Sequence, residues 1–131
     1  MTKLPTVEHP LLDDLVVQLR GSARGIADGD IVRLYNDRGA CLAAAVLSNA
    51  LRPGVVQLST GAWYDPEDPA SEKPLCVHGN PNVLTRDAGT SRLAQGCSGQ
   101  LSLVEVERFE GPVPRVKAFD PPPGTADRQV R

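Results

Sequence analysis

Most of the side chains suited to ligand binding lie in one stretch, Asn80–Ser91. It holds two amides, two threonine hydroxyls, a serine hydroxyl and a carboxylate around a single glycine. Amides and hydroxyls both donate and accept hydrogen bonds, which suits a polar heterocycle that presents both kinds of group. Backbone N–H groups at a short helix start near Asp87–Thr90 would suit a phosphate. A second interpretation stays open, in which these side chains only satisfy the local backbone.

Two smaller groups offer other chemistry. Cys76 and His78 would share one face of a strand, as a nucleophile and its base require, but no third residue is evident to orient the histidine. Asp65, Glu67 and Asp68 would supply carboxylates to a cation, but their spacing is not that of a calcium-binding loop. We therefore interpret both groups as loop residues and predict no catalytic residue and no metal ligand.

The cysteines and the apolar runs indicate the compartment. Cys41, Cys76 and Cys97 form no CxxC pair, which argues against a zinc site or a disulfide framework. Met1–Pro5 is followed by no apolar segment of a secretory signal. The longest apolar run, Ala40–Leu47, is far short of the roughly 20 residues that span a bilayer. We expect a cytoplasmic chain with reduced thiols and no membrane partner.

The composition favours a small protein of short strands. The chain has 131 residues, enough for one domain with a core, and it contains 12 glycines and 12 prolines. So many turn-forming residues argue against long helices. A net charge of −2 and only 4% aromatic residues give no basis for nucleic-acid binding. We expect a monomer.

The elements that must position the polar stretch are predicted from hydrophobic alternation and from turns such as Asp28–Asp30. The segment Cys41–Leu47 is apolar at both parities, as in a strand buried on both faces, although a short alanine-rich helix has a similar pattern. The predicted strands are Leu15–Arg20, Ile31–Tyr35, Cys41–Leu47, Val55–Ser59 and Leu101–Phe109.

Residues 60–100 contain four prolines and little periodicity, which is typical of a functional loop. Within it we predict a short helix over Ser91–Gln95, capped by Asp87 or Thr90. Residues 1–13 are predicted as an irregular lead-in, 14–110 as the domain, and 111–131 as a proline-rich, loosely held tail. Short strands with one long insertion indicate an all-β barrel or sandwich.

Three stretches in this order resemble one protein family. They are ARGIADGDIVRLYNDRG at 23–39, GAWYDP at 61–66 and NPNVLTRDAGTSRLAQ at 80–95. They are similar to the last domain of molybdenum oxidoreductases of the dimethyl sulfoxide reductase family, in the subgroup of biotin sulfoxide, trimethylamine N-oxide and dimethyl sulfoxide reductases. The resemblance covers about residues 15–110 and combines three separate motifs.

The resemblance implies a double-psi β-barrel that binds molybdopterin guanine dinucleotide, a pair of which chelates the metal in these enzymes (Mo-bis-MGD). The third stretch matches the loop of the family that faces the cofactor. The residues it implies as polar contacts to pterin or nucleotide are Asn82, Thr85, Asp87 and Thr90. The residues implied as further lining of the same site are Trp63, His78 and Asn80. For Trp63, a role as a core or interface residue is an equally good interpretation.

The chain also departs from the family. Family enzymes have several hundred residues, and the metal ligand and substrate funnel lie in parts that this sequence does not contain. An Arg-Leu-His-Ser-Gln-type stretch that touches the cofactor upstream of the barrel is replaced here by Glu8–Asp14. We therefore expect a module of an S- or N-oxide reductase that holds the pterin cofactor but does not catalyse substrate turnover alone. We also expect the isolated chain to lack the cofactor.

Two alternatives belong to other classes. In the first, the chain is a protein-interaction module. It would complete a split reductase by binding the remaining domains, or it would dock on a maturation partner. In the second, it is a free-standing enzyme if Cys76 and His78 act together as nucleophile and base.

Overall fold

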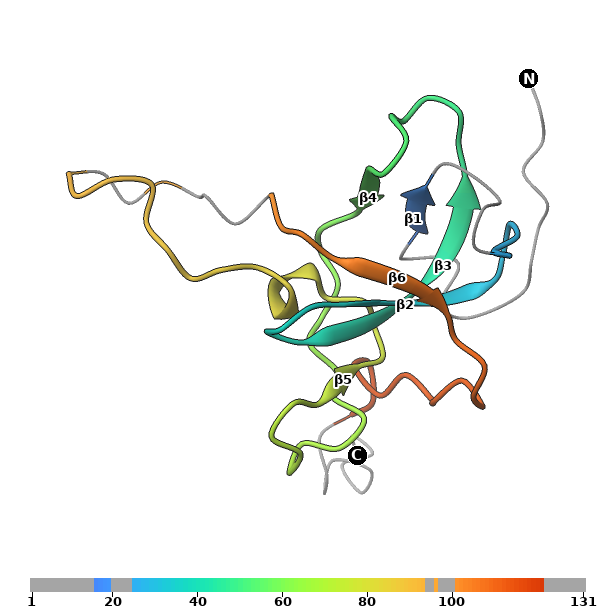
Figure 1. Ribbon diagram of the computed structural model, residues 1–131. Coiled ribbons are helices and arrows are strands. Elements are labelled where there is room, and N and C mark those ends of the chain that lie inside the picture. Colours follow the sequence, from blue (N-terminus) through green and yellow to red (C-terminus); the bar gives the residue numbers. More distant parts are fainter. Residues whose placement is uncertain (1–15, 20–24, 94–95, 97–100, 122–131) are drawn as a thin grey trace, which may run out of the picture.

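The computed structural model describes residues 25–93, 96 and 101–121, together with the backbone of residues 16–19. The described chain is mainly β, as predicted, with one short 3-10 helix and no α-helix (Figure 1). The elements are β1 (Val16–Leu19), β2 (Ile31–Tyr35), β3 (Ala40–Leu47), β4 (Val56–Leu58), β5 (Leu75–Cys76), η2 (Pro81–Val83) and β6 (Glu105–Arg108). No helix in these residues is long and apolar enough to cross a membrane.

The strands form one sheet in the order β4-β1-β3-β2-β6, with β5 paired to β3 off this path. Strands β2 and β3 are antiparallel, with Tyr35 opposite Ala40 and Ile31 opposite Ala44. Strand β1 pairs in parallel with β3 and antiparallel with β4, so both of its neighbours in the sheet come after β2 in the sequence. The sheet is therefore built largely from contacts between segments that are distant in the sequence.

Strand β3 is the centre of the core. It pairs with β1, β2 and β5, and its residues Cys41–Ala45 are all fully buried. Burial on both faces explains why small and apolar residues occupy both parities of this strand. The sequence pattern of this segment is compatible with a strand or with a short helix, and the structure shows a strand. Val32 and Leu34 pack on it from β2, where buried residues alternate with partly buried ones.

The turn between β2 and β3 comes from local chemistry. Asn36 accepts, through Oδ1, hydrogen bonds from the backbone N–H groups of Arg38 at 2.9 Å and Gly39 at 3.3 Å. The Asn36 N–H also donates to the Gly39 carbonyl at 3.0 Å. A side-chain amide thus replaces part of the strand ladder at the turn, which is the usual role of asparagine there. This turn places Arg38 and Gly39 beside η2.

Two predicted elements differ in the structure. Ser91–Leu93 are not helical, so a helix over 91–95 is wrong for its described part, and residues 94 and 95 lie outside the described ones. The predicted strand Leu101–Phe109 pairs with β2 only through β6, from residue 105 to residue 108. Leu101 and Leu103 are 93% and 92% exposed, because no neighbouring segment covers them in the described chain. The lead-in at 1–13 lies outside the described residues.

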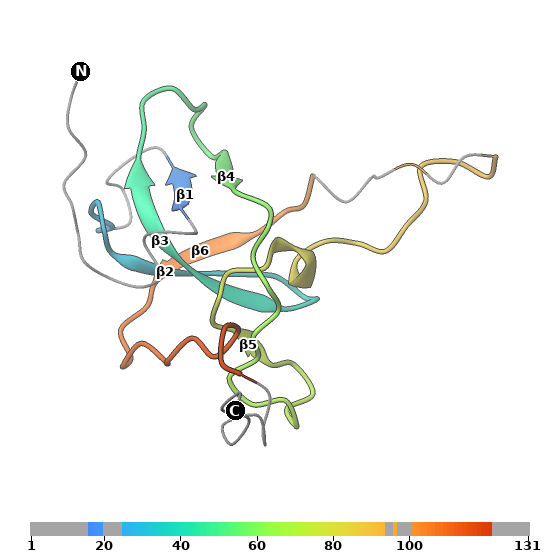
Figure 2. The same cartoon turned by 180° about the vertical axis from the view of Figure 1, so that it is seen from behind.

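The segment up to residue 121 returns to the far end of the sheet, where it lies beside β5 in both opposite views (Figures 1 and 2). There the buried carboxylate Oδ2 of Asp65 accepts hydrogen bonds from the backbone N–H groups of Lys117 and of Ala118, the second at 2.9 Å. The Phe119 ring meets His78 edge to face, with 5.1 Å between ring centroids. Residues 117–119, within the segment predicted as a loose tail, thus contact the body.

Burial makes the core thiol of Cys41 a source of alkali sensitivity. Cys41 on β3 lies opposite Cys76 on β5. Burial, and secondarily the negative charge of a Cys76 thiolate, raise the pKa of the Cys41 thiol from 9.0 to about 12. Between these values the unfolded chain releases this proton and the folded chain keeps it. The group therefore stabilises the fold fully below pH 9, and that contribution falls as the pH rises toward 12.

We expect the free energy of unfolding to fall with pH above 9 by up to about 1.4 kcal/mol per pH unit from this group. Chemical denaturation between pH 8 and pH 11 measures the slope. Other groups also titrate in this range, so the matched chain is Cys41→Ala, whose slope should be smaller. Parallel curves for the two chains would show that Cys41 does not titrate in this way.

Candidate functional site

The polar stretch found in the sequence begins with a tight turn around η2. Asn80 has an extended backbone (φ −66°, ψ 116°), and its Oδ1 accepts from the Asn82 N–H at 2.9 Å. Pro81 follows in the first helical position, where an N–H group has no partner in any case. Thr85 closes the turn by donating its hydroxyl to the Asn82 carbonyl at 3.1 Å. The side-chain amide of Asn82 takes no part in these bonds.

This turn is fixed to the β2–β3 hairpin. The Leu84 side chain is buried in the core, and its carbonyl accepts from Asn36 Nδ2 and from Arg38 Nε, each at 2.9 Å. Gly39 lies so close to Val83 that a Cβ atom at position 39 would come within 2.6 Å of the Val83 carbonyl oxygen. The hairpin and η2 therefore hold one another in a single arrangement, which fixes the backbone that carries Asn80 and Asn82.

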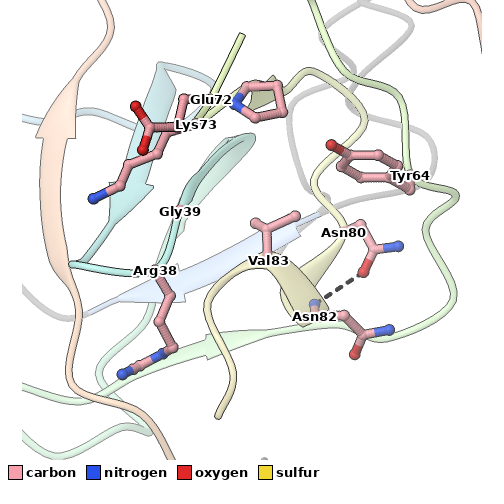
Figure 3. A pocket seen from close by; sticks show the side chains of 9 residues that line it. Arg38, Gly39, Tyr64, Glu72, Lys73, Asn80, Asn82 and Val83 are labelled. Carbon is pink, nitrogen blue, oxygen red and sulfur yellow. Dashed lines mark hydrogen bonds between the residues drawn. The ribbon is translucent and has the colours of Figure 1, made fainter. Parts of the chain in front are cut away.

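One pocket lies beside this contact, and we call it the basic pocket (Figure 3). Its volume is about 410 Å³. Arg38 and Lys73 lie on one side of it, Tyr64 and the amides of Asn80 and Asn82 lie on the other, and Gly39 and Val83 lie between them. Glu72 and Pro74 also line it. The wall therefore offers cations and amides, with one carboxylate.

A second pocket lies on the other side of the turn, and we call it the apolar pocket. Its volume is about 370 Å³. Apolar side chains come from β2, β4, the two ends of η2 and the segment before β6, and polar side chains complete the wall. The apolar members are Leu34, Val56, Leu58, Pro81, Leu84 and Val104, and the polar members are Thr60, Asn82, Thr85 and Ser102. Such a lining suits a flat heterocycle with polar edges.

Asn82 lines both pockets, so they meet at the η2 turn. Its amide offers two donor hydrogens and one acceptor oxygen at this junction. A ligand that carries an anionic group and a heterocyclic ring would find complementary chemistry on the two sides of one residue. Asn80, Asn82 and Thr85, three of the residues implied by the resemblance, are therefore brought together at the two pockets.

The other implied residues lie elsewhere. His78 is 2% exposed, its Nδ1 accepts from the Trp63 N–H at 3.1 Å, and it lines neither pocket. The Trp63 ring itself is on the surface, 65% exposed. Asp87 and Thr90 are exposed on a segment that extends away from the sheet (Figure 1), and neither lines either pocket. Their assignment to the cofactor stays a prediction.

The alternative chemical groups have structural roles instead. Cys76 Sγ lies 4.0 Å from the Trp63 carbonyl oxygen, and both Cys76 and His78 are buried, so neither presents a reactive atom to solvent. The Asp65 carboxylate is buried and accepts hydrogen bonds from the backbone N–H groups of residues 117 and 118. Asp68 Oδ1 accepts from the Ala70 N–H at 2.9 Å. In the described part of the chain, no three His, Cys, Asp or Glu side chains gather as a metal would need.

Sequence reasoning missed the cations of the basic pocket. Arg38 lies between the predicted strands Ile31–Tyr35 and Cys41–Leu47, and Lys73 lies in the proline-containing region 60–100. The pairing of β5 with β3 brings Lys73 next to the hairpin, where its Nζ donates to the Asp37 carbonyl at 3.0 Å. No local pattern signals this contact, because it depends on a parallel pairing between distant segments.

Comparison with known proteins agrees with the chemistry of these pockets. A family model described as "Molydopterin dinucleotide binding domain" matches residues 21–102, more than half of the chain. These residues include β2 to β5 and the η2 turn, and they include most of the residues that line both pockets.

Individual relatives are closely similar over the same region. The chain is 54% identical over 101 residues to a trimethylamine-N-oxide reductase of Salmonella typhi, which covers 77% of this chain and 12% of the relative. It is 50% identical over 103 residues to a dimethyl sulfoxide/trimethylamine N-oxide reductase of Cereibacter sphaeroides, with coverage of 79% and 12%. A reductase of the same description from Rhodobacter capsulatus is 45% identical over 118 residues, with coverage of 90% and 13%.

The chain therefore spans about an eighth of the length of these relatives. The match to the family model and the pockets at the η2 turn lead to one conclusion: the chain belongs to the molybdopterin dinucleotide-binding domain family, in the company of the dimethyl sulfoxide and trimethylamine N-oxide reductases.

Proposed function

We propose that this chain holds molybdopterin guanine dinucleotide for an S- or N-oxide reductase and does not catalyse turnover alone. The observation that carries the proposal is that Asn82, in the family-matched region, lines both pockets. The donor set fits the group: Arg38 and Lys73 suit phosphate oxygens, and the amides and hydroxyls of Asn80, Asn82 and Thr85 suit the edges of pterin and guanine. The fold in this proposal is a double-psi β-barrel, and the compartment is the cytoplasm.

When bound, the cofactor supplies the redox chemistry, and the protein supplies position and electrostatics. In this chain Asn80 and Pro81 fix the turn, Leu84 anchors it in the core, and Asn82 presents its amide at the junction of the pockets. The remaining walls of the site would come from other domains of a reductase. One domain covers only part of such a ligand, so we expect weak binding by the chain alone.

The test is a titration of the full ¹⁵N-labelled chain with GDP and with pterin-6-carboxylate, each taken to millimolar concentration. We expect saturable shifts of the Asn80, Asn82 and Thr85 amides, because these residues line the pockets. Amides of β6, such as that of Glu107, serve as the internal control, since β6 lines neither pocket. The absence of any saturable shift near η2 with both probes would overturn the proposed function.

A further inference from the structure

The side-chain amide of Asn36 connects three segments that surround the pockets. Its Nδ2 donates to the Leu84 carbonyl at 2.9 Å and to the Leu103 carbonyl at 3.2 Å. Its Oδ1 accepts from the backbone N–H groups of Arg38 and Gly39. Four bonds use the full hydrogen-bonding capacity of an asparagine amide. The β2–β3 hairpin, whose tip lies beside η2 in both opposite views (Figures 1 and 2), is thereby linked to the η2 turn and to the segment before β6.

The two carbonyls that share Nδ2 belong to two different segments that line the apolar pocket. Leu84 lines the pocket itself, and Ser102 and Val104, the two sequence neighbours of Leu103, line it as well. The Leu103 side chain is 92% exposed, so successive residues of this segment alternate between the pocket and the solvent. Because one nitrogen atom binds both carbonyls, the two segments cannot separate without breaking one of the bonds.

The bond to Leu103 holds the chain at a point where the sheet has ended. The pairing of β6 with β2 begins at Glu105, opposite Tyr35, so the ladder does not hold the residues before it. The Asn36 amide therefore extends the attachment of this segment beyond the last paired residue. Asn36 itself lines neither pocket, so it would act on a ligand only through the two segments that it holds.

We infer that Asn36 is a positioning residue for the apolar pocket: it sets the separation between the η2 turn and residues 101–104, and with it the width of the slot offered to a ring. The inference rests on the proposed function, and it adds a residue that does not touch the ligand. The amide has two separate tasks, because Oδ1 forms the hairpin turn and Nδ2 holds the pocket. A pocket held open in this way binds more tightly, since the ligand does not have to order its walls.

Two substitutions separate these tasks. Asn36→Ser keeps a short side-chain oxygen that accepts from backbone N–H groups in a turn, but it has no group that reaches both carbonyls. Asn36→Asp keeps the acceptor Oδ1 and replaces the donor nitrogen by a second acceptor. If Asn36→Ser does not fold, Asn36→Asp gives the same comparison. The matched control is Asn49→Ser, in the exposed turn after β3, which lines neither pocket.

The first measurement needs no ligand and uses the full ¹⁵N-labelled chain. The backbone amides of Thr85 and Val104 share a peptide group with the two carbonyls that Asn36 binds, so their signals report on those bonds. We expect both signals to shift in Asn36→Ser and in Asn36→Asp. The Arg38 and Gly39 amides should keep their slow exchange with solvent, because their acceptor is retained.

The second measurement is a titration of the same chains with GDP and with pterin-6-carboxylate, at a temperature where every chain is fully folded. We expect both variants to bind pterin-6-carboxylate about three- to tenfold more weakly than the native chain does, which corresponds to the loss of about one net hydrogen bond. Asn49→Ser should bind as the native chain does. A merely structural role of Asn36 would lower the stability and leave the affinity of the folded variants unchanged.

The outcomes separate this inference from the proposed function. Variants that bind both probes as the control does, or that leave the Thr85 and Val104 signals in place, would overturn the role of Asn36 and leave the proposed function standing. Weaker binding accompanied by fast exchange at Arg38 and Gly39 would mean that the whole turn is lost, which also contradicts a separate positioning role. A native chain that binds neither probe would overturn both proposals.

Discussion

Replacing Asp65 by alanine is expected to lower the free energy of unfolding by about 2–4 kcal/mol. Asp65 is 4% exposed, and its Oδ2 accepts from the backbone N–H groups of Lys117 and Ala118. A carboxylate that accepts from backbone N–H groups makes stronger bonds than a neutral acceptor does. Alanine would leave both N–H groups without this acceptor, and it would leave a space where the carboxylate was.

The same change should release residues 117–119 from the body. Phe119 covers His78, and the Lys117 ammonium reaches the carbonyls of Pro66 at 3.2 Å and Glu67 at 3.4 Å. These contacts depend on the position of the backbone that Asp65 holds. Faster amide exchange at Lys117 and Ala118, and a changed His78 ring signal, would therefore accompany the loss of stability.

Two further variants make this prediction specific. Asp68→Ala removes an exposed carboxylate of the same loop, whose Oδ1 accepts from Ala70 at 2.9 Å, and it should cost at most about 1 kcal/mol. Asp65→Asn keeps one acceptor oxygen and should lie between the native chain and Asp65→Ala. If Asp65→Ala and Asp68→Ala have the same stability, Asp65 does not hold the 117–119 segment.

The sequence predicts the elements whose causes are local. The β2–β3 turn follows from Asn36 and Gly39, and the apolar residues at both parities of 41–47 indicate a strand buried on both faces. The order of the strands has no such local cause. The parallel pairing of β1 with β3 depends on the whole sheet, because other registers satisfy the same hydrophobic patterns.

The candidate site divides in the same way. Asn80, Asn82 and Thr85 could be singled out because polar side chains are dense around them, and local bonds also shape the turn that they form. Asp87 and Thr90 are equally polar, but the backbone after Thr85 leaves the sheet, which side-chain chemistry does not reveal. Arg38 and Lys73 meet only because β5 pairs with β3.

The roles of Asp65 and His78 were also beyond local reasoning. The sequence alone suggests Asp65 as part of a cation-binding cluster and His78 as the partner of Cys76. Their partners are instead the segment at 117–119 and the backbone of Trp63. A buried polar group is satisfied by whichever donor the fold brings to it, and that donor here lies 52 residues away in the sequence.

Replacing Gly39 by alanine is expected to lower the free energy of unfolding by about 1–3 kcal/mol and to displace η2. The new Cβ would lie 2.6 Å from the Val83 carbonyl oxygen and 3.3 Å from its Cβ, so the atom in the way belongs to the backbone. A flexible side chain could rotate away, but this carbonyl can move only if the whole turn moves. The matched control is Gly111→Ala, whose nearest atom is at the far end of the Phe109 ring, at 3.1 Å.

The consequence for binding separates this variant from a general loss of stability. Val83 and Gly39 lie between the cations and the amides of the basic pocket, so moving η2 changes the separation of Arg38 from Asn82. The amide signals of Asn80, Asn82, Val83 and Leu84 in Gly39→Ala should shift, and the GDP affinity of this variant should fall at a temperature where it is fully folded. Gly111→Ala should keep both, since it lines neither pocket. Unchanged stability and affinity in Gly39→Ala would mean that the hairpin and η2 do not fix one another, and that the orientation of Asn82 has another origin.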